Sequence, residues 1–375
     1  MNLESLPTPC LVLDQDKMDA NIARMKTRVA ALGASFRPHL KTGKCIEVAR
    51  RMMSSDAGPA TVSTLKEAEQ FFAAGVTDLL YAVGIAPAKL DQVAELRTRG
   101  CELKIILDNV EAARALSAFC SERGIEIPVL IEIDSDGHRS GIEPESPLLL
   151  EVAAALTGGA RLLGVMTHAG GSYDQRSVEA IRRAAEVERL AVVRAAERLR
   201  AAGHEASVVS VGSTPTATFA DTLSGVTEVR TGVFVFQDLV MAGLGVCRVE
   251  DLALSLLVTV IGHQKERNWV ITDGGWMASS RDRGTAAQPV DQGYGLVCDL
   301  DGVAMQDFIV FGANQEHGIV ARRDGGPIDW ARFPIGARLR ILPNHACATA
   351  AQHSHYHVVA GTRDVCATWQ RFGGW

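Results

Sequence analysis

The sequence lacks the features of several protein classes. It has no run of about 18 apolar residues, which argues against a transmembrane helix. The first residues, MNLESLPTPCLVLD, lack a basic segment followed by an apolar one, so we expect no secretion signal. The formal net charge is -6 and no basic patch stands out. We therefore expect neither a membrane nor a nucleic acid as a partner.

Disulfide and metal motifs built on paired cysteines are also missing. The eight cysteines are spread through the 375 residues and none forms a CxxC pair. This distribution favours thiols packed as small core residues in a reduced, cytoplasmic protein. Apolar residues make up 47% of the chain and charged residues 22%, as in soluble globular proteins. The length fits two domains, or one barrel with an addition.

Strand-like and helix-like segments alternate from Pro9 to about residue 235. The alternation repeats about eight times, which predicts a parallel sheet. At this length a (β/α)8 TIM barrel, which needs about 250 residues, is preferred over a doubly wound open sheet. The strand-like segments are PCLVLD, SFRPHLK, PATVST, LLYAV, LKIILD, PVLIEID, RLLGVMTH, VVSVGS and EVRTGVFVF.

The pattern changes after about residue 246. Segments such as ALSLLVTVIGHQ, NWVITDGG and ARLRILPNHACA are typical of strands, and turns rich in glycine and aspartate separate them. We therefore predict an α/β fold with a barrel over residues 9–245 and a mainly β domain over residues 246–375. Residues 1–8 are compatible with membership of the β domain.

Polar residues follow several predicted barrel strands, where the active sites of such barrels gather. Lys41 follows SFRPHL, Arg139 lies in DSDGHRSG, and Tyr173 lies in THAGGSY together with His168. The turn Gly212–Ser213–Thr214 follows VVSV and is rich in backbone and hydroxyl donors, as a phosphate site requires. Such turns are common, so this one alone does not establish phosphate binding.

Lys41 has two interpretations. A single lysine is ordinarily solvated or paired with an acidic residue. The functional alternative is a lysine in a partly apolar pocket, where it loses its proton and forms a Schiff base with a carbonyl. Given a phosphate site, the carbonyl partner that fits is pyridoxal 5'-phosphate.

A second cluster of candidate residues is PNHACATAAQHSHYH, residues 343–357. If this segment is a strand, alternation places His345 and Cys347 on one face, and imidazole with thiolate suits zinc. His353, His355 and His357 also alternate and form a rival metal cluster. We interpret these three as solvated or interface residues, although the spacing alone does not decide between the clusters.

Several of these segments together support a resemblance that runs over nearly the whole chain. The chain resembles the eukaryotic-type D-serine dehydratases and the D-threo-3-hydroxyaspartate dehydratases. These are grouped with D-threonine aldolases among the alanine-racemase-like, fold-type III pyridoxal phosphate enzymes. The segments that carry the resemblance are TPCLVLD, RPHLKTGK, VSTLKEAEQFFAAG, IDSDGHRSG, THAGGSY, VSVGSTPTA, EVRTGVFVF, GWMASSRDRGT, GANQEHG and RILPNHACAT.

The resemblance implies roles for individual residues. It makes Lys41 the Schiff-base lysine, places Arg139 near the pyridine ring, and makes His345 and Cys347 the ligands of Zn2+. D-threonine aldolases can carry aspartate at the position of Cys347, so the cysteine favours zinc and the dehydratase branch. The segment HSHYH has no counterpart, and the role of Arg230 stays open. The phosphate region is assigned to Tyr173, Gly212, Ser213 and Thr214.

The implied reaction is β-elimination of water from a D-3-hydroxy amino acid, which gives a 2-oxo acid and ammonia. D-Serine and D-threo-3-hydroxyaspartate are the expected substrates, and the sequence does not choose between them. The main alternative is a metal-dependent D-threonine aldolase. An amino-acid racemase would not need His345 and Cys347, and non-enzymatic cofactor-binding relatives are single barrels. The fold family also suggests a homodimer.

Overall fold

The computed structural model describes all residues from Met1 to Trp375, and the chain forms two compact units. The barrel unit comprises Arg24–Gly232 and the last three residues, Gly373–Trp375. The β unit comprises Met1–Ala23 and Val233–Phe372. Helix α1 (Gln15–Ala31) begins in the β unit and ends in the barrel unit. The barrel unit is therefore inserted into the sequence of the β unit.

Eight parallel strands form the barrel in the order β2-β9-β8-β7-β6-β5-β4-β3. A parallel bridge between His39 and Thr61 joins the two ends of this sheet. The predicted (β/α)8 barrel is thus confirmed. The strands are β2 (Ser35–Phe36), β3 (Ala60–Val62), β4 (Asp78–Gly84), β5 (Glu102–Leu107), β6 (Ile127–Ile133), β7 (Ala160–Thr167), β8 (Val208–Val211) and β9 (Glu228–Val229).

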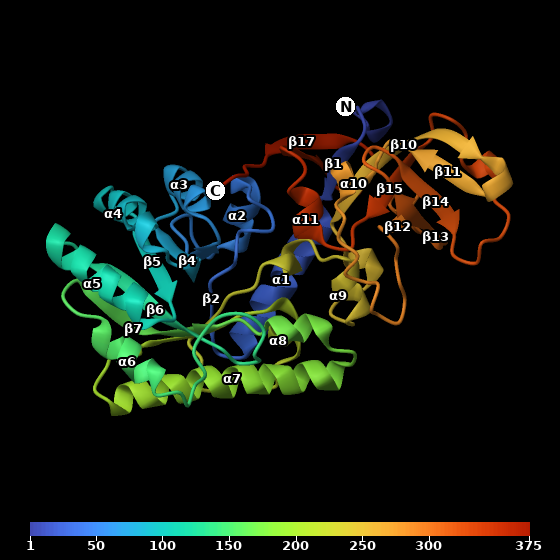
Figure 1. Ribbon diagram of the computed structural model, residues 1–375. Helices are drawn as coiled ribbons and strands as arrows, with labels where there is room; N and C mark the ends of the chain where they lie inside the picture. The colour runs from blue at the N-terminus through green and yellow to red at the C-terminus, as the bar shows by residue number, and fades with distance from the viewer. The chain divides into compact units, whose positions relative to one another are not determined.

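Helices connect successive barrel strands and lie on the outside of the barrel (Figure 1). Several begin at a side-chain cap: the hydroxyls of Thr64 and Ser177 each accept a hydrogen bond from a backbone N–H three residues on. Such caps satisfy N–H groups that the first helical turn leaves unpaired. The helices are α2 (Ile46–Met52), α3 (Leu65–Ala73), α4 (Leu90–Thr98), α5 (Val110–Arg123), α6 (Leu148–Ala155), α7 (Val178–Ala201) and α8 (Thr214–Phe219).

The core of the barrel contains a layer from four neighbouring strands. Leu80, Ile106, Leu130 and Met166 come from β4, β5, β6 and β7 in turn, and each is at most 1% exposed. Strands of a parallel barrel are buried on both faces, which explains why these segments are nearly continuous apolar runs in the sequence.

The β unit contains a nine-stranded sheet in the order β11-β14-β13-β12-β15-β10-β1-β16-β17. Strand β11 also pairs with β10, which curls one part of the sheet back on itself (Figure 1). The prediction of a mainly β C-terminal region is confirmed. Its strands are β1 (Cys10–Asp14), β10 (Leu254–Gln264), β11 (Trp269–Thr272), β12 (Leu296–Cys298), β13 (Ala304–Ala313), β14 (Gly318–Arg322), β15 (Arg338–Leu342), β16 (His355–Val359) and β17 (Val365–Gln370). Its short helices are α9 (Leu239–Gly243), α10 (Trp276–Ser279) and α11 (Ala346–Ala350).

The placement of PCLVLD in the barrel was wrong. This segment forms β1, which pairs antiparallel with β10 and parallel with β16 in the β unit. Four of its five residues are buried, so the strand lacks the alternation of apolar and polar residues that would distinguish a strand of the β unit from a barrel strand. A short apolar run fits either sheet, and its position in the sequence next to the barrel segments suggested the wrong one.

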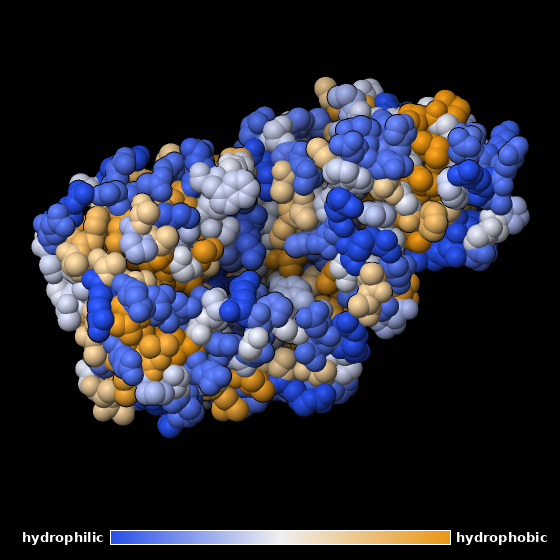
Figure 2. All heavy atoms as spheres, in the orientation of Figure 1, coloured by the Kyte–Doolittle hydropathy of each residue, from blue (hydrophilic) through white to orange (hydrophobic).

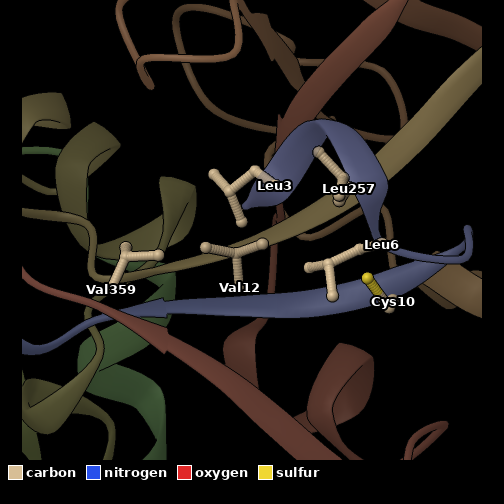
Figure 3. Close-up of a cluster of buried hydrophobic side chains, with 6 residues drawn as sticks. All are labelled: Leu3, Leu6, Cys10, Val12, Leu257 and Val359. Atoms are coloured by element: carbon tan, nitrogen blue, oxygen red, sulfur yellow. The ribbon is translucent and has the colours of Figure 1, made fainter. Parts of the chain in front are cut away.

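The N-terminus packs into the β unit. Leu3 and Leu6 lie against Val12 of β1 and Leu257 of β10, and all four are fully buried (Figure 3). Cys10 and Val359 complete this cluster. The first turn is a 3-10 helix, η1 (Leu3–Ser5), whose Asn2 side chain accepts a hydrogen bond from the N–H of Glu4. The residues before β1 thereby cover the pairing of β1 with β10.

The surface and the thiols show no specialised feature. Hydrophobic atoms lie in groups between hydrophilic ones on the visible face (Figure 2), which is ordinary for a folded protein. The structure contains no helix that is both long and apolar enough to cross a membrane. No cysteines are joined in a disulfide, and most of them are buried, as the sequence predicted. The buried ones are Cys10, Cys45, Cys101, Cys120 and Cys298.

We predict that Leu257→Ala destabilises the protein by about 2–5 kcal/mol, because it leaves a cavity in a closed cluster. Chemical denaturation measures the free energy of unfolding. The matched control is Val303→Ala, whose side chain is 63% exposed and should change that value by less than about 0.5 kcal/mol. Equal effects of the two substitutions would contradict the assignment of this cluster to the core.

Candidate active-site residues

Lys41 lies directly after the seam that closes the barrel. The N–H of His39 donates to Thr231 at 2.7 Å, and the N–H of Leu40 donates to the carbonyl of Thr61 at 2.8 Å. These bonds fix the backbone on both sides of the segment. Lys41 is the next residue, it is half-buried, and it stands in the turn that follows. The hydrogen bonds of the seam therefore fix the backbone that carries Lys41.

Arg37, four residues earlier, is satisfied by ion pairs within the barrel. Its Nε donates to Glu228 at 2.9 Å, and its Nη1 donates to Asp78 at 2.7 Å. Burial alone would lower the pKa of Arg37, but the two carboxylates hold it above its usual value. Lys44 likewise pairs with the buried Glu67 at 3.0 Å. Of the cations in RPHLKTGKC, these two have structural partners, and neither is a candidate for chemistry.

Two neutral histidines accompany Lys41. Burial, followed by the charge of Lys41, lowers the pKa values of both His39 and His168 well below the usual range. The charge of Arg139 lowers both pKa values further. The Nδ1 atom of His168 pairs with the carbonyl oxygen of Gly212. Both rings therefore carry no charge at neutral pH.

The other predicted residues of the barrel lie at the same ends of the strands. Tyr173 is half-buried, with its ring centroid 6.2 Å from that of His168, whereas Arg139 is exposed. Arg230 is buried and donates to the hydroxyl of Ser210 at 2.7 Å and to the carbonyl of Thr167. Since Arg230 and Arg139 both act on the pKa of His39, these residues belong to one electrostatic environment.

The turn Gly212–Ser213–Thr214 is buried and begins helix α8. The Ser213 hydroxyl lies 2.9 Å from the hydroxyls of both Ser172 and Thr216. The hydroxyl of Thr214 is buried and has no hydrogen-bond partner within the protein. A buried hydroxyl without a partner costs free energy unless a ligand satisfies it, so the turn fits an anionic group.

Sequence reasoning missed a buried acid behind this turn. Glu188 of helix α7 is 2% exposed and accepts hydrogen bonds from the N–H of Gly212 at 3.0 Å and from the Thr216 hydroxyl at 2.6 Å. The N–H of Gly212 is therefore directed at Glu188. In the sequence, Glu188 is one acidic residue in a long helix rich in arginine and glutamate, and no motif distinguishes it.

His345 and Cys347 lie at the start of a helix, so the strand that the sequence suggested there was wrong. His345 is the residue before α11 and Cys347 is the second residue within it. The two side chains are nevertheless hydrogen-bonded to each other. The strand β15 ends at Leu342, because Pro343 follows and cannot donate to the sheet.

Asp282, a second residue that sequence reasoning missed, holds His345. Its Oδ2 atom lies 2.7 Å from Nδ1 of His345. Burial lowers the pKa of His345, but the hydrogen bonds to Asp282 and Cys347 raise it to about 11. A carboxylate on one ring nitrogen leaves the other nitrogen directed elsewhere, as in many histidines that bind metals. No group of three or more histidine, cysteine or acidic residues is arranged to hold a metal.

The rival histidines lie on and beside β16. His355 and His357 have ring centroids 4.8 Å apart, and His353 pairs with the carbonyl of Ala278. We interpreted all three as solvated or interface residues; His357 is only 7% exposed within the chain, so it is not a solvated residue. It lies on a strand between β1 and β17, which buries it.

Comparison with known families assigns both parts of the chain. Residues 13–239 match the alanine racemase N-terminal domain, and residues 253–359 match the putative serine dehydratase domain. A D-threo-3-hydroxyaspartate dehydratase of Delftia sp. (strain HT23) is 58% identical over 100% of this chain and 99% of that protein. The chain belongs to the alanine-racemase-like D-serine dehydratase family. The resemblance drawn from the sequence motifs is confirmed.

More distant members of the family include dehydratases and aldolases. A D-serine dehydratase of Dictyostelium discoideum is 29% identical over 97% of this chain and 96% of that protein. A 3-hydroxy-D-aspartate aldolase of Paracoccus denitrificans is 28% identical over 95% of this chain and 89% of that protein. The identity to the dehydratase of Delftia sp. is about twice either value.

Solved structures of the family have the same fold. A histidine-to-alanine mutant of D-threo-3-hydroxyaspartate dehydratase has a TM-score of 0.98 and 57% identity, covering 100% of this chain and 97% of that one. A cysteine-to-alanine mutant of the same enzyme, in the metal-free form, has a TM-score of 0.98 and 56% identity, covering all of both chains.

We predict that Asp78→Asn destabilises the barrel more at pH 7 than at pH 3. Burial raises the pKa of Asp78, but Arg37 and Lys104 lower it below its usual value. Its carboxylate therefore stabilises the fold above the pKa of the unfolded chain, and this contribution is lost as pH falls through the folded pKa. The loss at pH 7 should be about 1–3 kcal/mol in the free energy of unfolding.

The matched control for this prediction is Asp91→Asn. Asp91 is 71% exposed and pairs with Arg123 on the surface, so its removal should cost less than about 1 kcal/mol at either pH. If Asp78→Asn lowers the free energy of unfolding by the same amount at pH 3 and pH 7, the ion pairs of Asp78 do not stabilise the barrel.

Proposed function

We propose that this protein is an ammonia-lyase that dehydrates a D-3-hydroxy amino acid, D-threo-3-hydroxyaspartate or D-serine or both, to a 2-oxo acid and ammonia. The observation that carries the proposal is full-length identity of 58% to a D-threo-3-hydroxyaspartate dehydratase. Lys41, which follows the barrel seam, supports it, and so does the pair His345 and Cys347 in the β unit, because these residues are the types that this reaction needs.

Pyridoxal 5'-phosphate is the proposed cofactor of the barrel unit. Lys41 would hold it covalently, and Arg139 would lie near its ring. Its phosphate would be held by the turn Gly212–Ser213–Thr214 and by Tyr173. The buried, unpartnered hydroxyl of Thr214 supports this assignment, since phosphate oxygens accept hydrogen bonds strongly.

Zinc is the proposed metal, with His345 and Cys347 as its protein ligands. Imidazole and thiolate are ligands that zinc favours, and two protein ligands leave positions for water and substrate. The two mutants among the related structures replace a histidine and a cysteine two positions apart, as His345 and Cys347 are, and the cysteine mutant is metal-free. Asp282 would orient the imidazole from its other nitrogen.

The chain's own residues would then move the protons of the reaction. When bound, pyridoxal phosphate supplies an electron sink for a carbanion at Cα, and a divalent metal stabilises charge on a departing hydroxyl. Lys41, tethered at the barrel seam, would take the Cα proton through its amine Nζ. His39 and His168, held neutral beside Lys41, would add no positive charge that opposes the approach of a proton.

The alternative function is a D-threonine-type aldolase that breaks the Cα–Cβ bond. Aldolases are among the relatives, but at 28% identity they are more distant than the dehydratase of Delftia sp.. Cys347 also favours the dehydratase. We further propose a homodimer, as the fold family suggests, and a reduced cytoplasmic location, which the buried thiols support.

Product analysis tests the function directly. The purified chain, supplied with pyridoxal phosphate and zinc, is incubated with D-serine, D-threonine and the stereoisomers of 3-hydroxyaspartate. We expect ammonia with oxaloacetate from D-threo-3-hydroxyaspartate or with pyruvate from D-serine. Glycine without ammonia would refute the dehydratase assignment and establish the aldolase instead.

Replacement of Lys41 tests the cofactor assignment. Lys41→Ala should abolish the long-wavelength absorbance band of covalently bound pyridoxal phosphate, because no other residue is proposed to form that bond. Absorbance spectroscopy of the purified variant measures it. Lys66→Ala, on the surface of α3, is the control and should keep the band. A Lys41→Ala protein with an unchanged band would refute the assignment.

Replacement of the proposed metal ligands tests the second site. His345→Ala and Cys347→Ala should lose bound zinc and activity while largely keeping the cofactor band, since the two groups of residues belong to different units. Elemental analysis measures the metal. His353→Ala serves as the control and should retain zinc. Full zinc content in both ligand variants would transfer the metal assignment to His353, His355 and His357.

A further inference from the structure

A buried carboxylate links the ends of two barrel strands. Besides Gly212 and Thr216, Glu188 accepts a hydrogen bond from the N–H of Ala169 at 3.2 Å. Ala169 follows β7, and Gly212 follows β8. One side chain of α7 thus ties together the two turns that carry the proposed phosphate residues Tyr173 and Ser213.

A chain of hydroxyls runs from Glu188 to Ser213. Thr216 lies 2.6 Å from Oε2 of Glu188 and 2.9 Å from the Ser213 hydroxyl. Ser213 in turn lies 2.9 Å from Ser172, whose own proton is donated to the carbonyl of Ala169 at 2.7 Å. Each hydroxyl has one proton to donate. The direction in which Ser213 donates therefore depends on where Thr216 sends its proton.

Glu188 determines that direction through its own protonation. When Glu188 is ionised, Thr216 donates to it, and the Thr216 oxygen becomes an acceptor that competes for the Ser213 proton. When Glu188 is protonated, it donates to Thr216, Thr216 donates to Ser213, and the Ser213 proton is available to an anion. The change requires one added proton on the carboxyl oxygen and rotation of two O–H bonds, and no other bond forms or breaks.

The surrounding charges favour the protonated state once an anion is bound. Burial raises the pKa of Glu188, although its three hydrogen bonds lower it. Arg230 is the cation that acts on Glu188, and it is shared with Glu228 and Glu132. His168 is neutral, and α8 carries no titratable side chain. A phosphate at Ser213 would add negative charge beside this carboxylate, which is unfavourable in a buried site unless a proton is taken up.

We propose that binding of the cofactor's phosphate takes up one proton at Glu188, which turns the hydroxyls of Thr216 and Ser213 towards the phosphate. This inference rests on the proposed function, which places the phosphate of pyridoxal 5'-phosphate at Ser213 and Thr214. Glu188 is a positioning residue in this scheme, because it acts on the ligand only through Thr216 and Ser213.

Glu188→Gln tests the proposal, because a glutamine amide donates to Thr216 as the protonated acid does. Calorimetric titration of the cofactor-free, full-length chain with pyridoxal 5'-phosphate, in buffers of different ionisation enthalpy, counts the protons taken up. We expect the wild type to take up about one more proton than the variant at pH 8. The affinity of the wild type should also fall relative to that of the variant as pH rises, by up to about tenfold per pH unit.

The titration of pyridoxal, which has no phosphate, should show neither difference. Because protonation changes at Lys41 occur in both proteins, they cancel in the comparison. Equal proton uptake by wild type and Glu188→Gln would overturn the proposal. The proposal would also be overturned if Glu188→Gln bound pyridoxal 5'-phosphate more than about tenfold more weakly than the wild type at every pH. That result would mean that binding needs the negative charge of the Glu188 carboxylate.

A second pair of variants tests the hydroxyl chain if Glu188→Gln does not fold. Thr216→Val keeps the shape but removes the hydroxyl that links Glu188 to Ser213, so the affinity for pyridoxal 5'-phosphate should lose most of its dependence on pH, while the affinity for pyridoxal is unchanged. Thr216→Ser should restore the dependence on pH. A Thr216→Val protein whose affinity for pyridoxal 5'-phosphate varies with pH as that of the wild type does would overturn the proposal.

Glu186→Gln is the matched control on the same helix, since Glu186 pairs with Arg189 at the surface and should behave as wild type. Circular dichroism checks the folding of each variant. A wild-type chain that does not bind pyridoxal 5'-phosphate at all would contradict the proposed function rather than the role of Glu188, so the two failures are distinguishable.

Discussion

The backbone hydrogen bonds at residues 37–40 close the barrel, and the candidate cofactor residues depend on that closure. On one side, the N–H of Arg37 donates to Val229 of β9 at 3.0 Å and that of His39 donates to Thr231 at 2.7 Å. On the other side, the N–H of Leu40 donates to Thr61 of β3, and the N–H of Thr61 donates to Pro38. An open sheet would leave these groups exposed at two edges. Closure satisfies them and brings the ends of the first and last strands together, so that Lys41 and Arg230 act within one environment.

A line of buried polar groups connects the two ends of this barrel. Glu228 accepts from Arg37 at 2.9 Å and from Ser210 at 2.8 Å, and Ser210 accepts from Arg230 at 2.7 Å. Each charged group in the line has a partner, as burial in a medium of low dielectric demands. The hydrogen bond to Ser210 therefore orients the side chain of Arg230 before any ligand binds. The charge of Arg230 interacts with several carboxylates and not with one alone.

The sequence predicted the repeating architecture and the motif-bearing turns, because both are local patterns. Strand–helix alternation indicated the barrel, and Lys41 and Ser213 stand in short recognisable segments. Pairing between strands far apart in the sequence was not predictable in the same way, which is why β1 was misplaced. Partners such as Glu188 and Asp282 were missed for the same reason: each reaches its target through tertiary packing, and neither stands in a distinctive local pattern.

The position of β1 has a consequence for the order in which the chain can fold during synthesis. Its partners, β10 and β16, emerge from the ribosome more than two hundred residues after it. Residues 24–232, which include all eight barrel strands, are translated within that interval, and these strands pair only with one another. While the inserted barrel forms, β1 has neither of its partner strands, and its apolar side chains and both of its edges are unpaired. The N-terminal segment is therefore the part of the nascent chain that is most prone to wrong pairing and most needs protection.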